Sequence, residues 1–128
     1  MMVLDASAAV DLLLDSRLGR RVAEQLDDDL VAPDLLHVDV CSAFARFVRA
    51  GVVDSSKADG AVGRLARLPV TSVSDALLVA PAWLLRDRVR ISDAFYVACA
   101  MAFRAPLLTT DARLGSAALP GVTVTVVR

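Results

Sequence analysis

The segment Met2-Val3-Leu4-Asp5-Ala6-Ser7 places an aspartate directly between a short apolar stretch and the start of a helical pattern. The same order recurs near the other end of the chain, where Asp111 follows the expected strand 107–110 and precedes a short helical stretch. In open parallel sheets, ligands bind outside the carboxyl ends of the strands, where the strand order reverses. If the two strands are neighbours, Asp5 and Asp111 face one crevice; the alternative is that each only caps the helix that follows it.

Strand and helix patterns alternate along the whole chain, and this alternation sets the fold class. The expected strands are residues 2–4, 30–32, 70–73, 107–110 and 122–127. The expected helices are residues 6–14, 18–26, 34–50, 55–68, 75–86 and 93–103, with a short helix after residue 111. The alternation predicts an α/β fold in which a mainly parallel sheet is covered by helices on both faces. With 128 residues, the chain is expected to form a single domain, residues 1–128.

Composition and charge exclude several classes of protein. A hydrophobic fraction of 56% rules out disorder, and the longest apolar run, residues 94–103, is half as long as the roughly 20 residues of a membrane helix. The amino terminus has no basic segment followed by an apolar stretch, so we expect a cytoplasmic protein, with Cys41 and Cys99 as reduced core residues. The net charge of −1 argues against broad adhesion to nucleic acid but leaves room for a local basic rim.

Asp93 is the most distinctive acid in the sequence. The residues that follow it, 94–103, are all apolar, which predicts a helix buried in the middle of the domain, with Ser92 as its cap. An aspartate in the first turn of a helix gains from the helix dipole, and this is the structural alternative for Asp93. A buried carboxylate also needs a partner, and Arg90 is the nearest arginine in the sequence.

Asp39 lies in the expected helix 34–50, about 80° from the centre of its apolar stripe. It is therefore expected at the border between the core and the open surface, with Arg46 pointing the same way two turns later. An ordinary boundary acid is the alternative. His37, the only histidine, is expected to be a packing residue at the same boundary.

A metal site follows if these four aspartates share one crevice. Four neighbouring carboxylates repel one another strongly unless a cation holds them, and Mg²⁺ and Mn²⁺ prefer oxygen ligands. No histidine or cysteine grouping competes for a metal. A carboxylate-bound ion can activate water and orient a phosphodiester without a nucleophilic side chain. Our candidates for both metal binding and catalysis are Asp5, Asp39, Asp93 and Asp111.

Four segments, in this order and at this spacing, resemble those that carry the acids of PIN domains. They are Val3-Leu4-Asp5-Ala6-Ser7, Ala32-Pro33-Asp34-Leu35-Leu36-His37-Val38-Asp39-Val40, Ile91-Ser92-Asp93-Ala94-Phe95-Tyr96-Val97-Ala98 and Leu107-Leu108-Thr109-Thr110-Asp111. Each segment alone is a weak signal, but four in sequence are specific. A chain of this size with little beyond the domain most resembles the VapC toxins of bacterial toxin–antitoxin pairs.

That resemblance implies a three-layer α/β/α sandwich with strand order 3-2-1-4-5, and a Mg²⁺- or Mn²⁺-dependent endoribonuclease that leaves a 5′-phosphate and a 3′-hydroxyl. It also implies a homodimer and a VapB-type antitoxin that places a peptide across the acidic pocket. Ser7 and Thr109 match positions that commonly support the acids by hydrogen bonding. For an RNA substrate, Arg46 is expected to contact a phosphate rather than a base.

The chain departs from the family pattern at Asp39, where the second acid is usually glutamate. The shorter side chain loses about 1.3–1.5 Å of reach, so Asp39 acts through a bridging water or its helix lies closer to the ion. Some relatives also have a fifth acid shortly after the fourth, which this chain lacks. The alternative function is a PIN-like binding module with reduced or lost catalysis. A phosphoryl-accepting receiver domain is disfavoured because the only lysine, Lys57, lies mid-chain.

Overall fold

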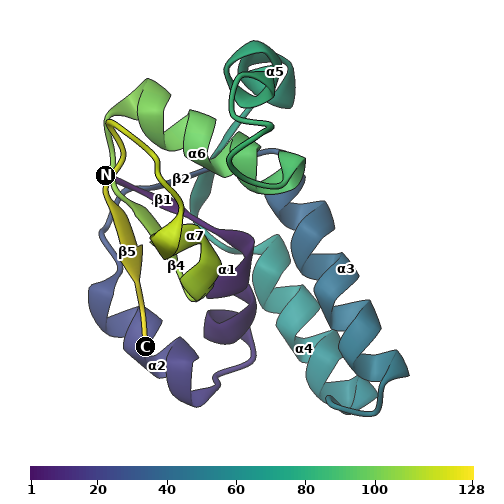
Figure 1. The fold of residues 1–128 in the computed structure, drawn as a ribbon. Coiled ribbons are helices and arrows are strands. Elements are labelled where there is room, and N and C mark those ends of the chain that lie inside the picture. Colours follow the sequence, from purple (N-terminus) through teal and green to yellow (C-terminus); the bar gives the residue numbers. More distant parts are fainter.

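The computed structural model describes residues 1–128 and contains five strands and seven helices (Figure 1). The strands are β1 (Met2–Leu4), β2 (Leu30–Pro33), β3 (Val70–Val73), β4 (Leu107–Thr109) and β5 (Val124–Val126). The helices are α1 (Ala6–Leu13), α2 (Arg17–Gln25), α3 (Leu35–Arg49), α4 (Ser55–Ala66), α5 (Asp75–Trp83), α6 (Ile91–Phe103) and α7 (Ala112–Ser116). The predicted order and type of these elements are therefore confirmed, and most boundaries agree within two residues.

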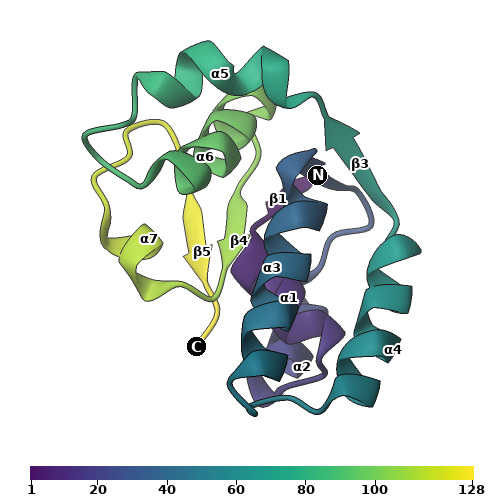
Figure 2. The ribbon, with the colours of Figure 1, turned by 90° about the vertical axis from the view of Figure 1, so that its right-hand side faces the viewer.

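The strands form one parallel sheet in the order β3-β2-β1-β4-β5, which confirms the expected fold class and strand order. The chain moves outward from β1 to β3, then returns across β1 through α5 and α6 to reach β4. Because such crossovers are right-handed, this reversal places α1–α4 on one face of the sheet and α5–α7 on the other. Figure 2 shows α5 packed on α6, and α3 beside α4.

The core lies on both faces of the two central strands. Val3 and Leu4 of β1 and Leu107 and Leu108 of β4 are at most 1% exposed, which is typical of parallel strands covered on both sides. Val3 pairs with Leu107 and Leu4 with Leu108, so the two strands end within one residue of each other. The residues that follow them, Asp5 and Asp111, are therefore brought to one edge of the sheet.

Helix α6 differs from the prediction at its start and in the burial of its last turn, whereas its end at Phe103 is as predicted. It begins at Ile91, and Arg90 occupies the cap position without a side-chain cap bond, so the prediction that Ser92 caps the helix is wrong. The helix is buried only as far as Ala100, and Phe103 in its last turn is 41% exposed.

Cys41 is also not the core residue that we expected. Cys99 is buried in α6, but Cys41 is exposed on the outer face of α3. The buried stripe of α3 lies on its other face, and Val38 on the same outer face as Cys41 is 68% exposed.

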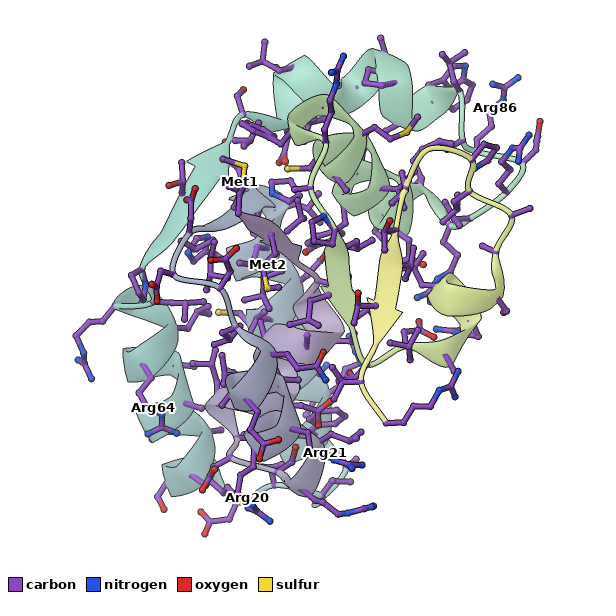
Figure 3. The ribbon with its side chains drawn as sticks, turned by 90° about the vertical axis from the view of Figure 1, so that its left-hand side faces the viewer. Met1, Met2, Arg20, Arg21, Arg64 and Arg86 are labelled. Atoms are coloured by element: carbon purple, nitrogen blue, oxygen red, sulfur yellow. The ribbon has the colours of Figure 1, made fainter.

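Basic side chains project from separate elements. Figure 3 shows Arg20 and Arg21 on α2, Arg64 on α4, and Arg86 after α5, at different places around the molecule. No helix is both long and apolar enough to cross a membrane.

The contact between α1 and α2 depends on a glycine. A Cβ added to Gly19, which is buried in α2, would lie 1.9 Å from the backbone oxygen of Asp11, whereas one added to Gly63 of α4 would meet nothing within 4 Å. We expect Gly19→Ala to lower the free energy of unfolding by about 1–3 kcal/mol through overpacking. Gly63→Ala, the matched control, should be neutral or stabilising by up to about 1 kcal/mol. Urea unfolding of both variants tests this, and equal stabilities would contradict the close approach.

Candidate active site

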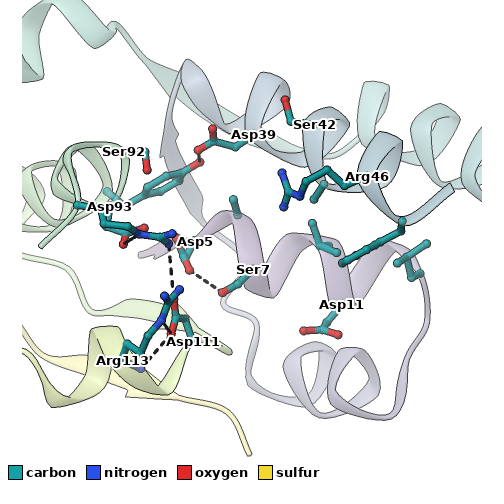
Figure 4. A pocket seen from close by; sticks show the side chains of 17 residues that line it. Asp5, Ser7, Asp11, Asp39, Ser42, Arg46, Ser92, Asp93, Asp111 and Arg113 are labelled. Carbon is teal, nitrogen blue, oxygen red and sulfur yellow. Dashed lines mark hydrogen bonds and ion pairs between the residues drawn. The ribbon is translucent and has the colours of Figure 1, made fainter. Parts of the chain in front are cut away.

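Four aspartates from four different elements line one pocket of about 450 Å³ at the carboxyl edge of the sheet (Figure 4). Asp5 follows β1, Asp111 follows β4, Asp39 comes from α3 and Asp93 comes from the first turn of α6. Figure 4 shows Asp5, Asp93 and Asp111 on one side of the pocket, with Asp39 and Arg46 reaching it from α3. The structure thus brings together every acid that the sequence analysis selected.

Asp5 is the buried member of the group, with 4% of its surface exposed. One of its oxygens, Oδ2, accepts hydrogen bonds of 2.6 Å from both Ser7 and Thr109. Those hydroxyls are fixed in turn, because the backbone N–H groups of Thr110 and Asp111 donate to them. Asp5 makes no side-chain cap bond to α1, so capping does not explain why an aspartate occupies this position.

Burial dominates the electrostatics of Asp5. Desolvation raises the pKa of its carboxyl, the two hydroxyl donors lower it, and the charge of Asp93 raises it further. No lysine or arginine forms an ion pair with Asp5. The carboxylate therefore carries a buried charge that only neutral donors stabilise.

Asp111 and Asp93, by contrast, are neutralised by arginines. Arg113 donates to both oxygens of Asp111, at 3.1 and 2.8 Å, and lowers the pKa of that carboxyl. Asp111 also caps α7 by accepting from the backbone N–H of Arg113, so the capping alternative holds for this residue alongside its place in the pocket. Arg90 pairs with Asp93 at 3.2 Å, as predicted, and lies 4.0 Å from Asp111.

Asp39 is half-buried and has a partner that the sequence analysis missed. The Tyr96 hydroxyl of α6 donates to Asp39 Oδ2 at 2.9 Å. Desolvation raises the pKa of Asp39, and desolvation together with the charge of Asp39 raises the pKa of Tyr96, so that hydroxyl keeps its proton and is the donor. A signal was present in the sequence, since a hydroxyl within an otherwise apolar helix needs a polar partner.

Asp11 also lines the pocket and was missed. Its carboxylate accepts from Thr110 and from Ser16, both at 2.8 Å, and thereby ties the end of α1 to the loop that carries Asp111. Figure 4 shows it on α1, apart from the four acids. Its role in this arrangement is to hold the loop.

The donor set suits a divalent metal. All four acids offer carboxylate oxygens, which Mg²⁺ and Mn²⁺ prefer, and Asp5 has a buried charge without a cationic partner. In this structure no three such side chains are grouped closely enough to hold an ion, and Arg90 and Arg113 contact two of the acids. Both arginine side chains are largely exposed, 64% and 73%, so they can turn away without disturbing the core.

Comparison with known proteins finds a family model and relatives that cover most of the chain. The family model for the PIN domain matches residues 2–119. Ribonuclease VapC3 of Mycobacterium tuberculosis is 39% identical over 117 residues, which cover 90% of this chain and 85% of that protein. Ribonuclease VapC1 of the same organism is 36% identical over 94% of this chain and 91% of its own length.

Two solved structures share the fold at low sequence identity. A toxin–antitoxin complex from Klebsiella pneumoniae has a chain that is 14% identical, with a TM-score of 0.68 and coverage of 100% of this chain and 98% of its own. A chain of VapBC2 from Rickettsia felis, bound to a DNA fragment from their promoter, is 10% identical, with a TM-score of 0.68 and coverage of 97% and 96%.

The raised pKa of Asp5 predicts a pH-dependent effect of Asp5→Asn. A carboxyl whose pKa is raised by folding contributes stability below its unfolded pKa and loses it as the pH rises through the folded pKa. At neutral pH without divalent metal, Asp5→Asn should therefore increase the free energy of unfolding by about 1 kcal/mol, because it removes a buried charge while an oxygen still accepts from Ser7 and Thr109. The gain should shrink toward pH 4, where the folded parent takes up a proton.

Urea unfolding in a chelator between pH 4.5 and 8 measures this difference. Asp54→Asn is the matched control, because Asp54 is an exposed N-cap whose pKa is lowered and asparagine caps a helix equally well. It should lose a little stability at neutral pH. A gain for Asp5→Asn that does not change with pH would contradict the role assigned to its charge.

Proposed function

The chain belongs to the PIN-domain family and groups with its VapC ribonucleases, and on this basis we propose that it is the toxin of a toxin–antitoxin pair, an endoribonuclease that hydrolyses RNA phosphodiesters. The observation that carries the proposal is the pocket at the carboxyl edge of the sheet, where four aspartates from distant parts of the chain converge. Convergence of like charges costs stability, so it needs a reason other than folding.

The proposed reaction depends on Mg²⁺, with Mn²⁺ as an alternative, held by Asp5, Asp39, Asp93 and Asp111. When bound, such an ion supplies an activated water and stabilises the leaving oxygen of the phosphodiester. The protein's own contribution is to fix the carboxylates: Ser7 and Thr109 donate to one oxygen of Asp5 and leave its other oxygen without a side-chain donor.

Three arginines line the same pocket and offer the local basic rim that the overall charge does not. Arg46, Arg90 and Arg113 come from α3, the start of α6 and α7. Arg46 forms no ion pair, and Figure 4 shows its guanidinium pointing into the pocket from the α3 side. This placement supports contact between Arg46 and an RNA phosphate.

The proposed partners are the RNA substrate, a VapB-type antitoxin and a second copy of the chain, in the cytoplasm. The antitoxin is supported by the VapC relatives and by structural neighbours solved as toxin–antitoxin complexes. The alternative of a binding module without catalysis is disfavoured, because the relatives are ribonucleases and because Asp39 still brings a carboxylate to the pocket.

Asp93→Asn tests the proposed function, because asparagine suits a helix terminus about as well as aspartate. Without metal, the variant should unfold within about 1 kcal/mol of the parent, since its ion pair with the exposed Arg90 contributes little. Millimolar Mn²⁺ or Mg²⁺ should raise the melting temperature of the parent, as any ligand of the folded state does, and raise that of Asp93→Asn less. RNA cleavage by the variant should fall by orders of magnitude.

The measurements are thermal unfolding with metal against sodium at equal ionic strength, and cleavage of a defined RNA. Asp87→Asn, an exposed aspartate outside the pocket, is the matched control and should behave as the parent. A variant of Asp93 that cleaves at the parental rate would remove Asp93 from the active site. A parent that neither binds metal nor cleaves RNA would overturn the function.

Arg46→Ala should weaken binding of all RNA substrates alike and reduce the slope of log affinity against log salt by about 0.7–1, the loss of one phosphate contact. Arg49→Ala is the control, because Arg49 is exposed on the same helix but does not line the pocket. Binding titrations at several salt concentrations measure the slope. An altered choice of cleavage site with an unchanged slope would show that Arg46 reads a base instead.

A further inference from the structure

Tyr96 joins the two helices that bring acids to the pocket from outside the sheet. It lies on α6, three residues after Asp93, and its hydroxyl donates to Asp39 of α3 across 57 residues of sequence. Residues three apart on a helix share a face, so Tyr96 and Asp93 approach the pocket together. The tyrosine is 1% exposed, which makes this contact part of the packed interior rather than of the mobile surface.

The bond to Tyr96 is the only hydrogen bond to the Asp39 side chain, and no lysine or arginine pairs with that carboxylate. The bond engages Oδ2 and leaves Oδ1 without a protein donor. Asp5 has the same arrangement, since the hydroxyls of Ser7 and Thr109 both donate to a single oxygen, Oδ2. Each of these two acids is thus held through one oxygen by neutral hydroxyls, with its other oxygen left for the pocket.

We propose that Tyr96 is the positioning residue for Asp39: its hydroxyl fixes the short carboxylate so that the second oxygen serves the metal site. This inference rests on the proposed function. A freely rotating aspartate would lose side-chain entropy when it engaged an ion, and a pre-formed hydrogen bond removes that cost. Second partners of metal ligands typically change metal affinity by about 10–100-fold when they are removed.

A double-mutant cycle on Mn²⁺ binding tests the proposal. Tyr96→Phe, which deletes only the hydroxyl, should weaken the Mn²⁺ affinity of the metal-free protein by about 10-fold or more in calorimetry. In an Asp39→Ala background the same change should have less than about a 2-fold effect, because the group it positions is gone. Val97→Ala is the matched control: Val97 is fully buried on α6 and does not line the pocket, so its truncation loosens packing while Mn²⁺ affinity should hold.

The chain has one tyrosine, so its spectroscopic signals report Tyr96 alone. The ¹³Cζ resonance of labelled tyrosine should shift when Asp39→Ala removes the acceptor, and should shift again when Mg²⁺ saturates the parent. This measurement uses the parent and Asp39→Ala only, so it tests the proposal even if Tyr96→Phe fails to fold. A ¹³Cζ chemical shift that does not change at saturating Mg²⁺ overturns the proposal.

The outcomes separate this proposal from the proposed function. Parental Mn²⁺ affinity in Tyr96→Phe, together with RNA cleavage by the parent, overturns the positioning role and leaves the nuclease standing. An equal loss in the parent and Asp39→Ala backgrounds also overturns it, because the effect would then be general. A parent that binds no Mn²⁺ and cleaves no RNA overturns both.

Discussion

Repulsion among four carboxylates at one edge of the sheet is the constraint around which the rest of the pocket is arranged. The aspartates are stabilised in two ways: arginines pair with Asp93 and Asp111, whereas hydroxyl groups donate to Asp5 and Asp39. The division follows burial, because a guanidinium can reach the rim of the pocket from the solvent but cannot be brought beside Asp5 without being desolvated itself. The interior acids therefore rely on neutral donors, which stabilise a charge without adding another charge to bury.

The position of β1 explains why Asp5 is the most buried acid. β1 is the central strand of the sheet, with β2 on one side and β4 on the other, and it carries helices on both faces. The residue after such a strand is enclosed on all sides except the crevice where the strand order reverses. Asp111 follows the neighbouring strand but begins the short helix α7, which keeps it nearer to solvent and within reach of Arg113.

Sequence periodicity predicted the elements well because the signals were strong and local, such as the continuous apolar run of α6 and the acids that directly follow apolar strands. It failed at a helix boundary and at a contact between distant segments. Arg90 rather than Ser92 occupies the cap position of α6, because the helix begins before its apolar run. The contact between Tyr96 and Asp39 depends on how α3 and α6 meet, and no pattern within either helix specifies that distance.

The charge balance of the pocket links its arginines to the proposed reaction. Without a divalent ion, Arg90 and Arg113 neutralise Asp93 and Asp111 at the rim. An ion held by the four acids would take over that neutralisation, since its two positive charges are more compact than a guanidinium and reach the buried Asp5 as well. The arginines would then lie beside the pocket without their acidic partners, and an unpaired guanidinium is a strong donor to phosphate oxygens. On the proposed function, metal binding and RNA binding therefore favour each other. The ion would neutralise the carboxylates that the two arginines leave, and the RNA phosphates would accept hydrogen bonds from the two arginines.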